Sequence, residues 1–306
     1  MCKYLLINTT YQKNIHNNMP SNSIKSFFSL VKFSHTIFAM PFAVIGFFVA
    51  VRKFNFPFDA LLFLKVIACM VLARNAAMAY NRYIDAGIDA KNPRTAMREI
   101  PAGVVSSNAA LAFVVLNCVA FITVTFFINT LCFALSPVAL AVILGYSWAK
   151  RYTALCHVIL GVGLSLAPIG AFVAVSGQFM LLPVLFSVVV LLWVSGFDII
   201  YALQDEDFDA NNHLHSIPQH LGKAEALNLA KLLHVGSCLL VLWAGSYGGF
   251  HIWYWLGACG FIGLVMYQHS LVTPTDLSKV NLAFFTTNGI ASVVFGAFVM
   301  LDLFLM

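Results

Sequence analysis

Long apolar runs, separated by short polar connections, constrain this chain more than any other feature. They lie near residues 28–51, 60–80, 107–128, 132–149, 155–175, 181–203, 226–246, 251–271 and 282–304. Each run holds about 18 residues or more, the length with which an α-helix crosses a bilayer. Charged residues make up only 9% of the chain, which excludes an ordinary water-soluble domain. The sequence therefore predicts an all-α integral membrane protein with about nine transmembrane helices.

The connections between the runs differ in charge, and this difference predicts the orientation of the chain. Those after the second, fourth, sixth and eighth runs are basic and contain Lys91, Arg94, Arg98, Lys150, Arg151, Lys223 and Lys279. Because basic loops stay on the cytoplasmic side, we expect the N-terminus and these connections in the cytoplasm and the C-terminus on the outer side. Arg52 and Lys53 are the exception, and we expect them to snorkel at the outer interface.

Residues 1–27 are polar and contain neither a signal-peptide core nor a cleavage pattern. We expect them to form a flexible cytoplasmic tail, followed by one polytopic transmembrane domain over residues 28–306. The basic residues lie between spans and are not interleaved with aromatic residues. The chain is therefore expected to contact the lipid bilayer and no nucleic acid.

Two acidic motifs follow apolar runs at equivalent places. Asn81, Asp85 and Asp89 are four residues apart at the end of the second run, so a helix places them on one face. Asp205 and Asp209 repeat this spacing at the end of the sixth run, and both stretches read DxxxDAxN. The repeat predicts two pseudo-repeated halves whose acidic ends face each other across one cavity.

Carboxylates that share a helix face repel each other unless a cation joins them. Hard oxygen ligands suit Mg²⁺, which typically bridges one or two carboxylates to a substrate phosphate. The basic residues near the acidic ends are candidates to bind the remaining phosphate oxygens: Arg82, Lys91, Arg94, Arg98, Lys150 and Arg151. The pattern predicts a diphosphate substrate held by Mg²⁺ and cations. The alternative is that the acids are solvated helix caps, in which case no ligand follows.

These residues resemble the motifs of the UbiA superfamily of membrane prenyltransferases, especially its 4-hydroxybenzoate polyprenyltransferase branch. Asn81, Asp85 and Asp89 match the family pattern NxxxDxxxD, and Asp205 and Asp209 match its second motif, DxxxD. The stretch 146–153 also resembles the cytoplasmic loop after the fourth helix of that family, where Lys150 and Arg151 would assist with diphosphate. The resemblance covers essentially everything after residue 28 and implies a UbiA-type bundle of nine spanning helices.

The resemblance implies an enzyme that transfers a polyprenyl group from polyprenyl diphosphate to a hydroxylated aromatic acid. The expected acceptor is 4-hydroxybenzoate, the pathway ubiquinone or menaquinone synthesis, and the location the bacterial inner membrane. Asp85, Asp89, Asp205 and Asp209 would hold Mg²⁺ and carry catalysis. The substrate-binding candidates are Asn81, Arg74, Arg82, Lys91, Arg94, Arg98, Tyr146, Lys150, Arg151, Asp198 and Tyr201.

Arg74 and Asp198 are ionisable residues inside apolar runs, which makes them functional candidates. Each lies seven residues before a motif residue, hence roughly 10 Å deeper along its helix. Arg74 is expected either to bind the carboxylate of the acceptor or to meet Asp198. If the two only pair with each other, their role is structural.

The segment after the second motif departs from the ubiquinone-pathway pattern. Members of that branch commonly carry a Lys-Ser-Thr run, whereas this chain has residues 214–218, Leu-His-Ser-Ile-Pro. A dihydroxynaphthoate acceptor, used on the way to menaquinone, therefore stays open. His213 and His215 have a spacing that suits a transition metal or a polar loop.

Other positions in the spans are predicted to line the cavity or to pack helices. The opening pattern of the family resembles Lys32, Ser34, His35 and Pro41 of this chain. Close helix packing is favoured by Gly161, Gly163 and Gly170.

The residues alone leave two rival functions open. One is a secondary transporter with a coupling site at Arg74 and Asp198; the other is a Mg²⁺-dependent lipid phosphotransferase.

Overall fold

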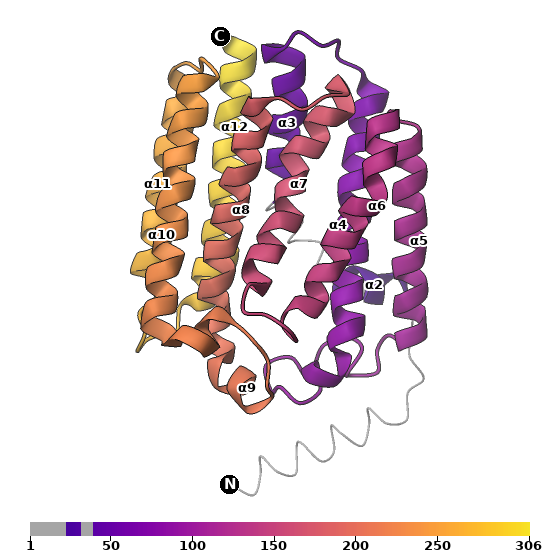
Figure 1. The fold of residues 1–306 in the computed structure, drawn as a ribbon, viewed down its shortest axis with the longest axis vertical. Helices are drawn as coiled ribbons and strands as arrows, with labels where there is room; N and C mark the ends of the chain where they lie inside the picture. Colours follow the sequence, from indigo (N-terminus) through magenta and orange to yellow (C-terminus); the bar gives the residue numbers. More distant parts are fainter. Residues whose placement is uncertain (1–22, 32–38) are drawn as a thin grey trace, which may run out of the picture.

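The computed structural model describes residues 23–31 and 39–306, and the regular elements of that part of the chain are helices (Figure 1). In chain order they are α2 (Ile24–Leu30), α3 (Met40–Lys53), α4 (Ala60–Asp89), α5 (Ser107–Phe126), α6 (Thr130–Ala149), α7 (Cys156–Ser176), α8 (Leu181–Ala202), η2 (Leu203–Asp205), α9 (Glu206–Asn211), α10 (Ile217–Tyr247), α11 (Ile252–Ser270), η3 (Leu282–Thr287) and α12 (Asn288–Leu305). The long helices run side by side as one bundle, with α5 at one edge and α10 and α11 at the other. The predicted all-α fold is confirmed.

Seven helices of the described chain are long and apolar enough to cross a membrane, so the protein is an integral membrane protein. Each of the nine predicted runs overlaps a different one of the helices α3 to α8 and α10 to α12, but α3 and α11 are not among the seven. Helix α3 has only 14 residues, and α11 includes polar residues such as Gln268 and His269. The number of nine spans stays a prediction.

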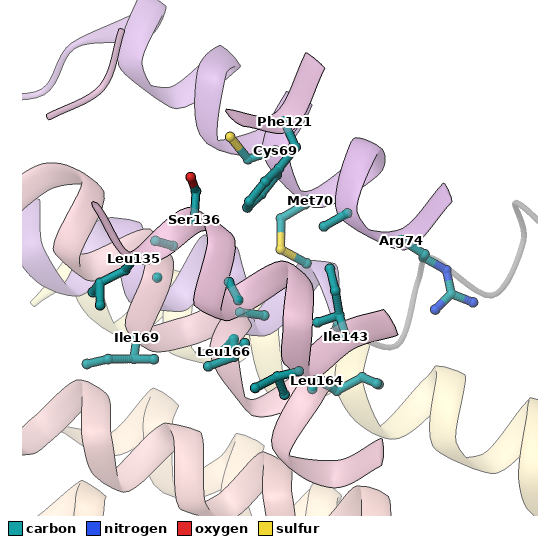
Figure 2. A pocket seen from close by; sticks show the side chains of 18 of the residues that line it. Cys69, Met70, Arg74, Phe121, Leu135, Ser136, Ile143, Leu164, Leu166 and Ile169 are labelled. Atoms are coloured by element: carbon teal, nitrogen blue, oxygen red, sulfur yellow. The ribbon is translucent and has the colours of Figure 1, made fainter. Parts of the chain in front are cut away.

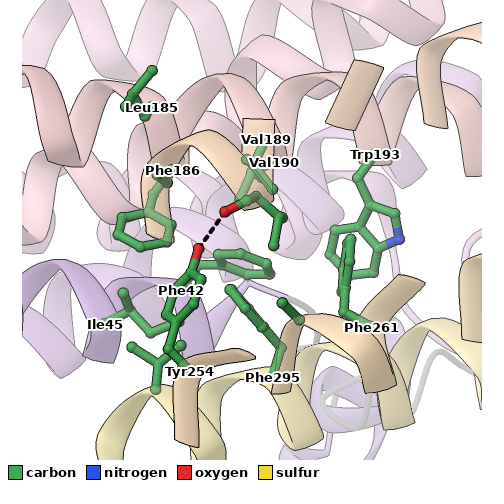
Figure 3. Close-up of a cluster of buried hydrophobic side chains, with 14 of the residues drawn as sticks. Phe42, Ile45, Leu185, Phe186, Val189, Val190, Trp193, Tyr254, Phe261 and Phe295 are labelled. Carbon is green, nitrogen blue, oxygen red and sulfur yellow. Dashed lines mark hydrogen bonds between the residues drawn. The ribbon is translucent and has the colours of Figure 1, made fainter. Parts of the chain in front are cut away.

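The core of the bundle is an aromatic cluster around α8. Trp193 and Phe186 of α8 are fully buried, and they pack against side chains of α3, α11 and α12 that include Phe42, Tyr254 and Phe295 (Figure 3). The Tyr254 hydroxyl donates to the carbonyl of Val241 at 2.6 Å, which satisfies its polar atom inside the core. This cluster fixes α8, and α8 leads directly into the second acidic motif.

Arg52 and Lys53 lie at the end of the bundle opposite the acidic motifs. The Arg52 Nε donates to the Leu303 carbonyl at 2.9 Å, and the Lys53 ammonium donates to the Gly249 carbonyl at 2.9 Å. Backbone carbonyls at helix C-termini lack intrahelical partners and attract cations. These contacts give a structural reason for two positive charges that the distribution of basic loops does not explain.

The chain entering the bundle contains a short helix that the sequence did not predict. Helix α2 begins at Ile24, inside the stretch expected to be a tail, and Ser29 donates to the Glu99 carboxylate at 2.5 Å. Leu30 packs in a buried cluster with Ile100 of the loop after α4. Lys32, Ser34 and His35 lie outside the described residues, and Pro41 is in the first turn of α3.

One of the three glycines predicted to pack helices does so at close range. A Cβ at Gly161 would lie 2.6 Å from the Leu191 carbonyl oxygen of α8 and would also meet Ser195. The prediction for Gly170 is wrong, because a Cβ there meets no atom within 4 Å. At Gly163 the nearest atom, on Ile143, is 3.7 Å away, an ordinary contact.

We expect Gly161→Ala to lower the free energy of unfolding by about 1–3 kcal/mol, because α7 and α8 must separate to admit the methyl group. Gly170→Ala, on the same helix, is expected to be neutral or slightly stabilising since alanine favours the helical state. Thermal unfolding of the purified variants in one detergent measures the difference. Equal midpoints for the two variants would contradict the close contact.

Candidate active site

The acidic motifs and the basic loops meet at one end of the bundle, which we call the motif end (residues 85–105, 147–157 and 198–220). The first motif lies in the last turns of α4. The Asn81 amide donates to the Asp85 Oδ2 at 2.9 Å, and the Arg151 guanidinium lies 3.2 Å from the Asp85 Oδ1. Asp89 is buried, and its Oδ1 pairs with the Arg98 Nη1 at 2.6 Å.

The second motif begins where α8 tightens into η2 and continues into α9. Asp205 is buried and accepts two hydrogen bonds from Arg94, from Nε at 3.0 Å and from Nη2 at 2.5 Å. The Asn92 amide adds a third at 3.2 Å. Burial by itself lowers the pKa of Arg94, but the hydrogen bond and charge of Asp205 raise it above its ordinary value. The loop that follows the first motif therefore binds the second.

Lys150 and Arg151, neighbours after α6, connect the two motifs from the other side. The Lys150 ammonium lies 2.7 Å from the Asp209 Oδ1, while Arg151 reaches Asp85. The Lys150 carbonyl accepts the His215 N–H at 2.8 Å, which ties the loop before α10 to the same place. The predicted juxtaposition of the two acidic ends is therefore present in the structure, with a basic dipeptide between them.

Each of the four motif aspartates has its own basic partner, and these partners are four of the six predicted phosphate-binding cations. The other two are placed differently. Lys91 is exposed and takes part in none of the ion pairs of the described chain. Arg82 is buried, and its Nε has no hydrogen-bond partner among the described residues.

The donor set of the motif end fits a hard divalent cation in its chemistry. Its carboxylates supply oxygen ligands, and the buried Asp89 Oδ2 has no hydrogen-bond partner among residues 23–31 and 39–306. The same residues contain no group of three His, Cys, Asp or Glu side chains close enough to share one ion. In the described structure the motif carboxylates instead form ion pairs with arginine and lysine side chains. His213 and His215 accordingly form no metal group there.

An apolar cavity of about 400 Å³ lies between α4, α5, α6 and α7. Figure 2 shows Arg74 at one end and Leu135 and Ile169 at the other. Tyr146 also lines the cavity, and it lies within electrostatic reach of Asp85, one of the motif residues. The cavity therefore extends from the neighbourhood of the first motif along the bundle.

Arg74 and Asp198 do not pair with each other, so the structural alternative given for them is wrong. The Asp198 Oδ2 instead lies 2.7 Å from the Nδ1 of His157, a residue of α7. Arg74 forms no ion pair within the described chain, and its buried Nε has no hydrogen-bond partner there. A cation beside an apolar cavity without a protein partner is available to a charged ligand.

Tyr201 lies beside the Arg94 and Asp205 pair, in contact with Arg94. Its hydroxyl accepts a hydrogen bond from the Arg94 Nη1 at 2.9 Å, and the guanidinium carbon is 5.2 Å from the ring centroid. The ring stacks on Phe284 with centroids 4.1 Å apart. Phe284 belongs to η3, a short π-helix, a distortion that often marks functional sites.

Sequence reasoning missed the roles of Asn92 and His157. Asn92 stands in the repeated DxxxDAxN pattern, so the pattern itself contained a signal that was not used. His157 lies in an apolar run, where an ionisable residue is a functional candidate in its own right. Its partner is 41 residues away in sequence, and no spacing rule connects them.

The sequence profile of the UbiA prenyltransferase family matches residues 39–290, which cover α3 through η3 and both acidic motifs. The chain belongs to the UbiA prenyltransferase family. It is therefore an enzyme, a membrane prenyltransferase, and the transporter alternative is set aside. The resemblance seen in the motif residues is confirmed.

Relatives of known name and structure agree with this assignment. A 4-hydroxybenzoate octaprenyltransferase of Aeromonas salmonicida is 30% identical over 233 residues, which cover 76% of this chain and 80% of the relative. A UbiA homologue from Aeropyrum pernix superimposes with a TM-score of 0.79 at 33% identity, over 88% of this chain and 98% of the other. A UbiA homologue from Archaeoglobus fulgidus, solved with GPP and Mg²⁺, has a TM-score of 0.73 at 18% identity over 91% of this chain and 99% of its own. That last likeness shows the fold.

Proposed function

We propose that this enzyme transfers a polyprenyl group from polyprenyl diphosphate to a hydroxylated aromatic acid, 4-hydroxybenzoate, with Mg²⁺ as cofactor. One observation carries the proposal: four acidic and four basic side chains meet beside a long apolar cavity that has a free arginine near its end. The names of relatives about 30% identical supply the acceptor. We propose that the motif end faces the cytoplasm at the bacterial inner membrane, with the C-terminus outside, and the positive-inside rule supports this orientation.

The charged residues of the motif end divide into two sets for the diphosphate. Asp85, Asp89, Asp205 and Asp209 would hold Mg²⁺, with Asn81 orienting Asp85. When bound, Mg²⁺ offsets the negative charge that grows on the departing diphosphate. Arg94, Arg98, Lys150 and Arg151 pair with these aspartates in the structure and, with the aspartates engaged elsewhere, would donate to phosphate oxygens.

The cavity explains how one site handles two unlike substrates. Its walls are apolar along α4, α6 and α7, which suits the hydrocarbon tail of the donor. Arg74 gives the carboxylate of the aromatic acid an ionic partner, and the ring of Tyr146 lies on the same cavity. Aromatic faces also stabilise an allylic cation without reacting with it.

The unusual segment after the second motif has a structural reason that does not depend on the acceptor. Leu214 is buried, and Ser216 is the N-cap of α10, where its hydroxyl accepts the Gln219 N–H at 3.3 Å. A dihydroxynaphthoate acceptor would use the same carboxylate and hydroxyl chemistry. The experiment below therefore compares the two acids.

Purified protein is expected to release diphosphate and form a prenylated product from a polyprenyl diphosphate and 4-hydroxybenzoate, and only when Mg²⁺ is present. Parallel reactions contain a dihydroxynaphthoate or no acceptor, and mass spectrometry identifies the product. Product from the dihydroxynaphthoate alone would correct the acceptor. Absence of metal-dependent release with every acceptor would overturn the proposed function.

A further inference from the structure

His157 and Asp198 form a pair within the motif end that none of the steps above uses. The His157 Nδ1 lies 2.7 Å from the Asp198 Oδ2. The side chain of His157 is 3% exposed, whereas that of Asp198 is 22% exposed. The second carboxylate oxygen, Oδ1, has no hydrogen-bond partner in the described part of the chain. The Oδ2 of Asp198 is therefore bonded to His157, while its Oδ1 is available to another hydrogen-bond donor.

The backbone at the start of α10 determines which nitrogen of His157 carries the proton. The Ile217 N–H donates to the His157 Nε2 at 3.3 Å, so Nε2 must present a lone pair. The ring proton is then on Nδ1 and is donated to Asp198. The positive end of the α10 dipole also disfavours a second ring proton. A neutral imidazole thus donates its Nδ1–H to the Asp198 carboxylate.

Asp198 lies near the place proposed for the acceptor. Tyr146, which lines the cavity, interacts electrostatically with both Arg74 and Asp198, so the two charged groups lie in the neighbourhood of one tyrosine. Leu160 lines the apolar cavity, and His157 lies one helical turn before it on α7. An aromatic acid whose carboxylate binds Arg74 would therefore have its ring close to Asp198.

We infer that Asp198 is the general base for the aromatic acceptor and that His157 is its positioning residue; this inference rests on the proposed function. The Asp198 Oδ1 takes the proton of the phenol. The ring carbon next to the phenol oxygen then bonds to the terminal prenyl carbon, whose bond to the diphosphate oxygen breaks, and the electron pair leaves with diphosphate. The resulting dienone moves its ring proton to oxygen and regains aromaticity, and the proton on Asp198 passes to water.

The test compares 4-hydroxybenzoate with 3-fluoro-4-hydroxybenzoate, whose hydroxyl is more acidic and needs less help from a base. We expect His157→Leu to lower kcat about 100-fold with 4-hydroxybenzoate, a typical contribution of general-base catalysis, and less than about 10-fold with the fluorinated acid. His157→Asn, whose amide N–H replaces Nδ1–H, should recover most of the rate. The KM for polyprenyl diphosphate should not change in either variant.

His234→Asn is the matched control, because His234 is also buried and bonded, 2.7 Å from His269 and 3.0 Å from the Trp193 carbonyl. Any loss it causes should be equal for the two acids. An equal loss for the two acids in His157→Leu would overturn the inference and leave the proposed function intact. If the wild type prenylates neither acid, the proposed function itself fails. If His157→Leu does not fold, Asp198→Asn is tested in its place. The loss of kcat with 4-hydroxybenzoate is again compared with the loss of kcat with the fluorinated acid.

Discussion

Replacing Asp205 by asparagine is expected to lower the rate of prenyl transfer about 100-fold or more, because the site loses both a metal ligand and the charge that holds Arg94. Arg94 binds both oxygens of Asp205, through Nε and Nη2. An amide keeps the size of the side chain but offers only one acceptor and no charge. Diphosphate release measured over a Mg²⁺ titration should show a lower maximal rate and a higher metal requirement.

Asp207→Asn is the control for this substitution, since Asp207 is exposed on α9 and takes part in none of the ion pairs of the described chain. It removes the same charge two residues away, from the short helix whose N-cap is Asp205. We expect its rate to stay within about 2-fold of the wild type because an exposed charge contributes little. Similar losses in the two variants would mean that only the overall charge of the motif end matters.

The sequence was sufficient to predict a helical membrane bundle because apolar length and the 1.5 Å rise per residue leave few alternatives. The prediction of the number of spans was less certain where a helix mixes apolar and polar residues. Helix α11 carries Tyr254 and Gln268, whose hydroxyl and amide N–H donate to the Val241 and Ala283 carbonyls inside the bundle. Such partners are tertiary, so a hydropathy pattern cannot show them. The helical start at Ile24 was missed because its packing partners lie in the loop after α4.

For the candidate site, spacing predicted which carboxylates share a face but not what each of them contacts. The step of four residues places Asp85 and Asp89 together, and the repeat led to Asp205 and Asp209. Arg94 reaches across 111 residues of sequence to Asp205, a distance no local rule covers. The same holds for Asp198, which pairs with His157 and not with Arg74, the pairing that was one of two alternatives.

Removing Lys150 tests whether the cations of the motif end have a structural role in addition to phosphate binding. The Asp209 side chain is 0% exposed, and Lys150, itself 34% exposed, is its ionic partner at 2.7 Å. Lys150→Met leaves a buried carboxylate without a charge partner. We expect this variant to lose about 3 kcal/mol of stability, because breaking a buried ion pair from one side costs more than the pair itself contributes.

The double variant separates this structural effect from catalysis. Adding Asp209→Asn to Lys150→Met removes the unpaired charge, so stability should return to within about 1 kcal/mol of the wild type while activity stays lost. Thermal unfolding in detergent with a chelator measures the stability, and diphosphate release with Mg²⁺ measures the activity. Lys223→Met is the control; its partner Glu206 is 3.4 Å away and, at 23% exposed, is not a fully buried carboxylate like Asp209, so the expected loss is below about 1 kcal/mol. A double variant less stable than Lys150→Met alone would show that the Asp209 charge is needed by the fold itself, and that Lys150 is not what balances it.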